Sequence, residues 1–318
     1  MFSVERKRGA FVFCVMLVAA IIMSACGSNG GNASSSGKDA APAGSKEIQH
    51  EAGKTVVPAE PKRIVVLEFS FVDALWQLGI KPVGIAHENK DDIDLMLGQK
   101  IDYTSVGTRA EPSLETISTL KPDLIIADQN RHEAIYKDLS AIAPTLILKS
   151  RNASYEEVIS AFQTIAEAVG KKEEGSRVLE EHRAKLEKLK AEIPANENRK
   201  VLVGVFRSDS LSAHGAKSFD GNLLELMNIP NAIQNAPGAT AKISLEQLVE
   251  WNPDVIFMAE ADDDLLNEWS KNPLWQNIDA VKNKQVFEVN RSLWTRFRGL
   301  DSAEKIAQEA IDHLYPKG

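Results

Sequence analysis

Residues 113–126 read SLETISTLKPDLII, and residues 244–257 read SLEQLVEWNPDVIF. Six of the fourteen positions are identical, and four of the other eight exchange one apolar residue for another. Each copy predicts a short helix that begins after Ser, ends before Pro-Asp and leads into an apolar strand. A unit that recurs once, about half a chain length later, predicts two similar α/β lobes. It also places the same carboxylate, Glu115 and Glu246, near the start of the same helix in each lobe.

Short apolar runs alternate with helical patterns on both sides of the two copies. The further predicted strands occupy residues 63–67, 82–86, 144–148, 200–206 and 286–289. The further predicted helices occupy residues 71–78, 134–140, 220–227, 264–269 and 302–314. This alternation is typical of mostly parallel sheets covered by helices. We therefore expect an α/β fold with an N-terminal lobe at about 55–165 and a C-terminal lobe at 198–318.

The middle of the chain has a different pattern. Residues 155–169 predict an amphipathic helix that ends at Gly170, and residues 171–194 predict a long connecting helix that ends at Pro194. Leu179, Leu186 and Leu189 form an apolar stripe among many charged residues. About twenty helical residues span about 30 Å. One long helix between two α/β halves predicts a rigid strut.

The N-terminus predicts export. Arg6, Lys7 and Arg8 precede an uncharged, mostly apolar stretch at 9–23, which is short for a membrane span and suits a cleaved signal peptide at 1–25. The Ser-Ala-Cys sequence that ends at Cys26 resembles a bacterial lipobox, which implies lipidation of Cys26. A Gly/Ser/Ala/Asn-rich flexible tether is expected at 26–50. The alternative is a plain secretory signal with an incidental cysteine.

Composition and motifs argue against several classes of function. A formal net charge of −8 disfavours nucleic acid or an anionic membrane surface as the main partner. The common hydrolase, zinc-protease, phosphate-loop and dinucleotide motifs do not occur in the sequence, and the six His residues lack metal-ligand spacing. We expect no enzymatic activity, no resident cofactor and no protein-bound metal.

Arginines are the candidate binding residues. Arg291, Arg296 and Arg298 lie in RSLWTRFRG, between the last predicted strand and the last helix, where α/β sheets present ligands. Their guanidinium groups would repel one another unless an anion joined them, and each is suited to a carboxylate. Arg109 and Arg131 flank the first copy of the repeat. Surface salt bridges are the alternative role for all five.

These features together resemble one family. The lipobox, the tether, the phrase LKPDLII with an upstream Glu, the long central helix and the second Glu-bearing copy are similar to the helical-backbone (class III) substrate-binding proteins of ABC importers. Phrases such as LSAIAPTLIL and DALWQLGIKPVG resemble the ferric-siderophore and ferric-citrate lipoproteins of Gram-positive bacteria. The resemblance covers residues 45–318. It implies two Rossmann-like lobes joined by one long rigid helix, with the ligand in a cleft between the lobes.

The resemblance also assigns roles to residues. In members that take citrate-type siderophores, arginines that align with Arg109, Arg131, Arg291, Arg296 and Arg298 line the cleft. A His that aligns with His214 joins them. Citrate-chelated Fe(III) carries several carboxylates and a filled coordination sphere, so the protein need supply only cationic donors.

The resemblance implies partners as well. Glu115 and Glu246 would each dock into one subunit of a dimeric permease that works with a cytoplasmic ATPase. The alternative role of each carboxylate is to stabilise the N-terminus of its helix by charge–dipole attraction. The protein would be a monomer, anchored by lipid at the outer face of the cell membrane. The alternative ligands are a catecholate siderophore, haem or cobalamin, and a two-lobed α/β enzyme is the alternative of a different class.

Overall fold

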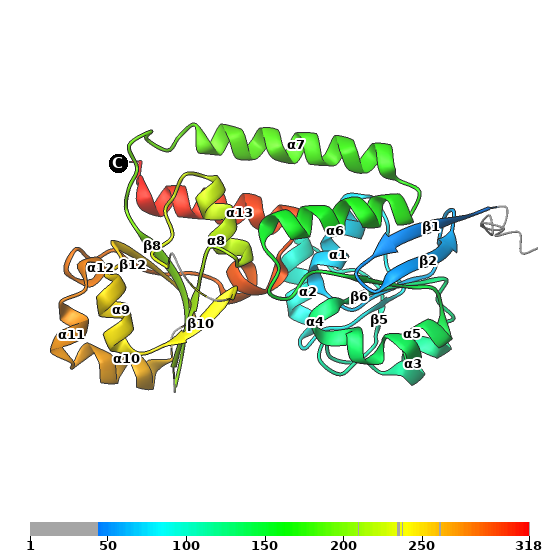
Figure 1. The fold of residues 1–318 in the computed structure, drawn as a ribbon, viewed down its shortest axis with the longest axis horizontal. Helices are drawn as coiled ribbons and strands as arrows, with labels where there is room; N and C mark the ends of the chain where they lie inside the picture. Colours follow the sequence, from blue (N-terminus) through cyan, green and yellow to red (C-terminus); the bar gives the residue numbers. More distant parts are fainter. Residues whose placement is uncertain (1–43, 209, 234–235, 237, 261, 318) are drawn as a thin grey trace, which may run out of the picture. The chain divides into compact units, whose positions relative to one another are not determined.

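The first sheet is built from short strands, most of which are apolar and buried on both faces. The structure is a computed structural model that describes residues 44–208, 210–233, 236, 238–260 and 262–317 (Figure 1). The first-lobe strands are β3 (Ile64–Val66), β4 (Gly84–Ile85), β5 (Thr104–Ser105), β6 (Leu124–Asp128) and β7 (Thr145–Leu148). They pair in parallel in the order β5-β4-β3-β6-β7. Ile64 and Val66 enter one core cluster while Val65 and Leu67 enter another, as alternation on a strand requires.

Helices connect these parallel strands. They are α1 (Phe69–Gln77), α2 (Lys90–Leu97), α3 (Leu114–Thr119), α4 (Gln129–His132), the 3-10 turn η1 (Glu133–Ile135) and α5 (Tyr136–Ile142). The prediction of a parallel, helix-covered sheet is confirmed for this lobe. The short helices α2 and α4 were not predicted.

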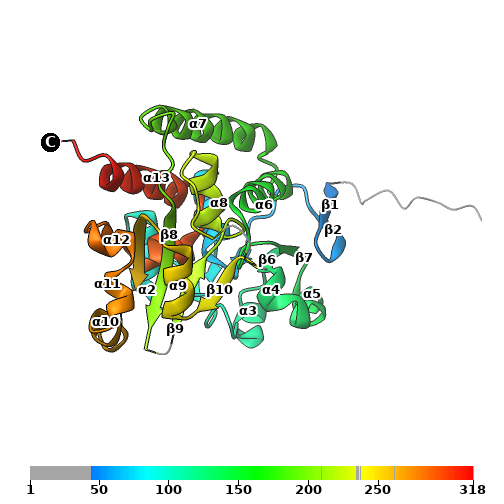
Figure 2. The same cartoon turned by 60° about the vertical axis from the view of Figure 1, so that its left-hand side comes forward.

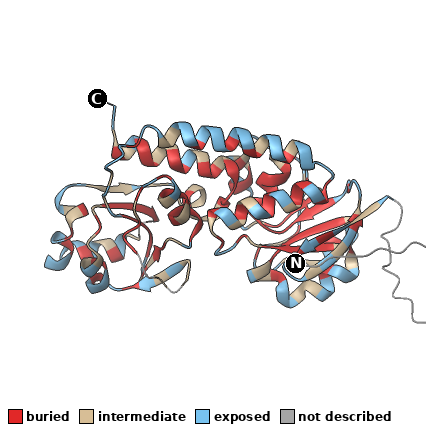
Figure 3. Cartoon of the chain, turned by 45° about the horizontal axis from the view of Figure 1, so that its top comes forward, coloured by how far each residue is buried: buried red, intermediate tan, exposed pale blue. Residues whose placement is uncertain are grey.

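The second lobe repeats the plan with an antiparallel addition. Its strands are β8 (Val201–Arg207), β9 (Ser210–His214), β10 (Thr240–Ile243), β11 (Val255–Glu260) and β12 (Val286–Glu288). The sheet order is β10-β9-β8-β11-β12: β8, β11 and β12 are parallel, and β9 and β10 are antiparallel to their neighbours. Figure 2 labels β8, β9 and β10 of this sheet. The helices are α8 (Phe219–Leu226), α9 (Leu245–Trp251), α10 (Asp263–Ser270), α11 (Pro273–Gln276), α12 (Asp279–Lys282), the π-helical η2 (Ser292–Phe297) and α13 (Leu300–Leu314). Figure 3 shows that the strands of both sheets are mostly buried.

The last part of the expected tether is folded. β1 (Ser45–His50) and β2 (Gly53–Pro58) form an antiparallel hairpin, so the predicted boundary of the tether at residue 50 is wrong. Ile48 and Val57 are buried in the first-lobe core, and Glu51 N donates to Ile147 O beside β7. Alternating burial in a polar sequence explains why composition alone missed this hairpin. The predicted signal peptide, Cys26 and the rest of the tether lie outside the described residues.

Three helices, rather than one, join the two cores. α7 (Lys172–Lys190) corresponds to the predicted strut and spans about 28 Å at about 1.5 Å per residue. Leu179 of α7 packs in the first-lobe core and Leu186 in the second. α6 (Tyr155–Ala168) and α13 also contribute to both cores, and α7 lies alongside them (Figures 1 and 2). The expected single strut is therefore one member of a three-helix layer, because the apolar face of each helix covers both lobes.

The repeated Ser opens the same helix in both lobes, as predicted. The hydroxyl of Ser113 accepts a hydrogen bond from Thr116 N at 3.2 Å, and that of Ser244 accepts one from Gln247 N at 3.4 Å. The third helical residue therefore completes each cap. The repeated carboxylates, Glu115 and Glu246, lie one position before these third residues, whose backbone nitrogens donate to the capping Ser.

The repeated Asp anchors the first strand of each lobe. The carboxylate of Asp123 accepts from the backbone nitrogens of Lys62 and Arg63 at 2.7 and 2.8 Å, just before β3. Asp254 accepts from Lys200 N at 2.7 Å, just before β8. The repeated Asp therefore has a structural role in both lobes, since it fixes the backbone where the first strand of the sheet begins.

Asp73 connects the first lobe to the N-terminus of α13. Its Oδ2 accepts from Leu300 N at 2.8 Å, and the carboxyl group lies so close to Gly299 that a Cβ there would meet it at 2.4 Å. Burial, opposed by the Leu300 hydrogen bond and aided by Asp301, raises the pKa of Asp73 from its ordinary value of 3.8 to about 6.

A buried acid with a raised pKa makes stability depend on pH. Below pH 3.8 the carboxyl is protonated in both the folded and the unfolded state, and as the pH rises through 6 the folded protein must ionise a buried group. We expect this group to cost up to about 3 kcal/mol of unfolding free energy between pH 4 and pH 7. Denaturant titrations of wild type and Asp73→Asn should diverge across that range. Parallel curves would contradict the assignment.

Candidate functional site

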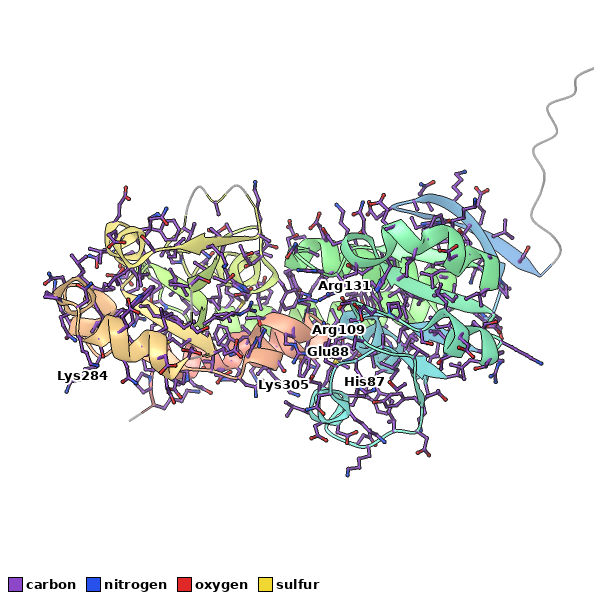
Figure 4. All side chains as sticks on the ribbon, turned by 90° about the horizontal axis from the view of Figure 1, so that it is seen from below. His87, Glu88, Arg109, Arg131, Lys284 and Lys305 are labelled. Carbon is purple, nitrogen blue, oxygen red and sulfur yellow. The ribbon has the colours of Figure 1, made fainter. Side chains whose placement is uncertain are left out.

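Charged side chains gather at the carboxyl ends of the first-lobe strands. Glu68 follows β3, Glu88 follows β4, Arg109 follows β5, and Asp128 ends β6 just before Arg131. Figure 4 labels His87, Glu88, Arg109 and Arg131, which lie near one another. The carboxyl ends of parallel strands share one edge of the sheet, which is where such folds bind ligands.

Glu68 is the centre of this cluster. Its side chain is completely buried, and it accepts from Arg109 Nη1 at 3.0 Å, from Arg298 Nη2 at 3.2 Å and from Arg131 Nε. Burial alone would raise the pKa of Glu68, but the three arginines outweigh it and hold the pKa below its usual value. Sequence reasoning missed this residue.

Arg298 reaches the first lobe from the turn between η2 and α13. It has a left-handed backbone, with φ of 51°. Its Nη1 donates to Thr295 O at 2.8 Å, and burial lowers the pKa of the guanidinium from its usual value while Glu68 opposes the shift. It therefore joins Arg109 and Arg131 at one carboxylate.

An aromatic ring supports the arginines. The guanidinium carbons of Arg109 and Arg296 lie 4.0 and 5.4 Å from the centre of the Phe69 ring. Phe297 packs edge-on against the same ring at 5.6 Å. Cation–π contact and the rigid aromatic pair fix both guanidinium groups in place.

Glu88 and Asp92 hold Arg296. Arg296 Nη2 lies 3.0 Å from Glu88 Oε2, and Nη1 lies 3.0 Å from Asp92 Oδ2. Glu88 also accepts from Arg109 Nε at 2.9 and 3.1 Å, and Ser292 Oγ donates to Asp92 Oδ1 at 2.8 Å. Burial would raise the pKa of Glu88, yet Arg109 and Arg296 keep it below its usual value. These contacts join α2 of the first lobe to η2.

Arg291 lies in a separate ion pair. Its Nη1 is 2.8 Å from Glu260 at the end of β11, and Arg207 Nε at the end of β8 is 3.8 Å from the same carboxylate. The structure therefore divides the predicted arginine trio: Arg296 and Arg298 meet Arg109 and Arg131, whereas Arg291 does not.

Among the described contacts, His214 makes no hydrogen bond or ion pair with these arginines, and its role at the site stays a prediction. Strand register places it opposite Val203, and Ser210 opposite Arg207, so His214 lies about 13 Å along the strand from the carboxyl end of β8 at about 3.3 Å per residue. Its Nδ1 pairs with buried Asp220 at 2.9 Å. The sequence placed His214 only as following a strand, whereas it ends β9, the antiparallel neighbour of β8.

Trp294, in the same segment as Arg291, Arg296 and Arg298, is fully buried in the second-lobe core. Its ring packs on Phe257 at 4.7 Å and its Nε1 donates to Glu309 at 2.6 Å. Its side chain therefore belongs to the core rather than to the surface of the site.

A hollow adjoins the cluster. It has a volume of about 640 Å³ and is lined by Gln129, Asn130, Arg131, Glu133 and Ala134. Within the described part of the chain, no group of three or more His, Cys, Asp or Glu side chains could hold a metal ion. Among the same residues, none of the helices combines the length and apolar character that crossing a bilayer requires.

Glu115 and Glu246 are both exposed, each as the second residue of its helix, α3 or α9. The Ser244 hydroxyl holds the pKa of Glu246 below its usual value. The acids that sequence reasoning missed, Glu68, Glu88 and Asp92, lie elsewhere. The first two each closely follow a predicted strand, which is the signal that could have found them.

Comparison with known proteins identifies the family of this chain. The family described as "Periplasmic binding protein" matches residues 64–293. The Fe(3+)-citrate-binding protein YfmC of Bacillus subtilis is 48% identical over 96% of this chain and 97% of its own length. The Fe(3+) dicitrate-binding periplasmic protein FecB of Escherichia coli is 38% identical over 83% of this chain and 88% of its own.

A solved structure agrees with this relationship. SirA of Staphylococcus aureus, complexed with staphyloferrin B, superposes with a TM-score of 0.75 at 28% identity, covering 85% of this chain and 98% of that protein. The family match spans most of the two lobes and includes α6 and α7 between them. The chain therefore belongs to the periplasmic binding protein family, whose members are binding proteins rather than enzymes.

Proposed function

We propose that this protein captures a carboxylate-rich ferric chelate, with ferric citrate as the first candidate, and delivers it to an ABC permease. The observation that carries the proposal is the convergence of four arginines, Arg109, Arg131, Arg296 and Arg298, at one sheet edge and the facing turn. The names of YfmC and FecB, which state ferric citrate and dicitrate, support this choice of ligand.

The chemistry of such a ligand suits these residues. A citrate chelate occupies the coordination positions of Fe(III) with its own oxygens and presents outer carboxylate oxygens to the protein. Guanidinium groups bind carboxylates through two parallel, charge-assisted hydrogen bonds. Phe69 and Glu68 hold the arginines in place before a ligand arrives, which reduces the entropy lost on binding.

Calorimetric titration of the purified protein tests the proposal. Ferric citrate should bind. Metal-free citrate should bind much more weakly, because it is a flexible molecule that carries fewer carboxylates than the rigid ferric chelate. A ferric catecholate chelate, haem and cobalamin complete the panel. Tight binding of one of these three, with no response to ferric citrate, would overturn the proposed ligand.

Truncation of the arginines should weaken ferric citrate binding. Arg296→Ala and Arg298→Ala are each expected to lower the affinity more than tenfold, since a hydrogen bond to a charged group contributes about 1.5–3 kcal/mol. Arg177→Ala removes an exposed arginine of α7 and serves as the control. The Arg296 side chain is 21% exposed and pairs with Glu88 and Asp92 rather than with Glu68, so unchanged affinity in Arg296→Ala would contradict the site assignment.

We also propose a lipid anchor at Cys26 and contact with the permease through Glu115 and Glu246. Exposure of both carboxylates at equivalent positions in the two lobes supports the second proposal. A dimeric permease would present two equivalent sites to this repeated feature.

A further inference from the structure

We propose that Glu88 is an internal competitor of the ligand: its carboxylate takes guanidinium donors that a ligand carboxylate would use. The inference rests on the proposed function, because it assigns a selecting role to a residue of the same arginine cluster.

Glu88 links one arginine of each lobe. Both of its oxygens lie within 3.1 Å of Arg109 Nε, and Oε2 lies 3.0 Å from Arg296 Nη2. Its side chain is 37% exposed, whereas that of Glu68 is fully buried. A partly exposed carboxylate on the connection between β4 and α2 can rotate into water, and a fully buried one cannot.

Each of the two arginines keeps a second anchor. Arg109 Nη1 is held by Glu68 at 3.0 Å, and Arg296 Nη1 is held by Asp92 at 3.0 Å and donates to Ser292 Oγ at 3.0 Å. Departure of Glu88 would therefore release Arg109 Nε and Arg296 Nη2 without freeing either side chain. The two released donors would face a ligand from both lobes.

The charge balance makes this exchange selective. Arg109, Arg131, Arg296 and Arg298 are opposed by Glu68, Glu88 and Asp92, while the Asp128 carboxylate accepts from the backbone nitrogens of residues 131, 150 and 151. A monocarboxylate only replaces the charge that Glu88 already supplies. A chelate with several carboxylates brings more negative charge than Glu88 and can displace it.

Glu88→Gln tests the inference, because the amide keeps the shape and loses the charge. We expect ferric citrate to bind about tenfold more tightly to this variant, since a charge-assisted competitor has been weakened. Acetate should inhibit binding to Glu88→Gln and have little effect on wild type. Glu180→Gln, an exposed acid on α7, makes the same change of charge elsewhere and should match wild type.

Each outcome decides between the two proposals. Equal or weaker binding by Glu88→Gln, with wild type binding normally, would overturn the inference. Weaker binding would make Glu88 a positioning residue for the arginines. A wild-type protein that fails to bind ferric citrate would overturn the proposed function and this inference with it. Thermal unfolding of each variant checks that the fold is retained.

Discussion

Glu68→Gln is expected to lower the free energy of unfolding by about 3–5 kcal/mol, because removing one partner of a buried ion pair leaves uncompensated charge. Glu68 is fully buried, and the side chains of Arg109, Arg131 and Arg298 are between 5% and 15% exposed. The amide could accept from one or two guanidinium groups but would neutralise none. Three buried positive charges would then repel one another.

Urea denaturation of the purified variant measures this effect. Glu88→Gln is the matched control, because it makes the same chemical change at a carboxylate that is 37% exposed, and it should cost no more than about 1 kcal/mol. Equal losses in the two variants would contradict the central role of Glu68. A loss confined to Glu68→Gln would show that the arginines depend on this one carboxylate.

The lobes and their repeated element were predictable because they follow from local patterns. Ser113 and Ser244 cap helices through the backbone nitrogens of residues three positions later. Apolar strands between helical patterns then predicted a parallel sheet. Such features require no knowledge of how distant segments meet.

The arrangement of the site depends on distant segments, which is why the sequence predicted it only in part. Arg298 meets Glu68 across 230 positions because a left-handed residue ends the π-helical turn η2. In the same turn, Arg296 forms an ion pair with Glu88, whereas Arg291, just before the turn, forms one with Glu260. No local pattern separates three arginines that are so close in sequence.

The acids were overlooked for a related reason. The arginines of the sequence pointed to an anionic ligand but not to the carboxylates that balance them in the free protein. A cluster of arginines in a folded protein also requires internal carboxylates, because guanidinium groups that are buried together repel one another. Glu68 meets that requirement by permanent burial, and Glu88 meets it from a partly exposed position. The difference in exposure separates a structural counter-charge from one that can be exchanged.

The second large effect concerns delivery. Glu115→Ala combined with Glu246→Ala should abolish uptake of iron-55 citrate by cells that rely on this protein, while calorimetry gives an unchanged affinity for ferric citrate. Both carboxylates are exposed on the first turns of α3 and α9, and neither completes a helix cap. Their removal should therefore leave the folded lobes and the arginine cluster intact.

A matched double variant separates docking from loss of surface charge. Asp138→Ala with Glu250→Ala removes one exposed acid from each lobe, and uptake should remain normal. Single variants should be partly active, because a two-fold partner keeps one of its two contacts. Normal uptake in the Glu115 and Glu246 double variant would exclude docking through this pair. Their equivalent positions in the two copies of the repeat would then have to arise from the attraction of a carboxylate to a helix N-terminus.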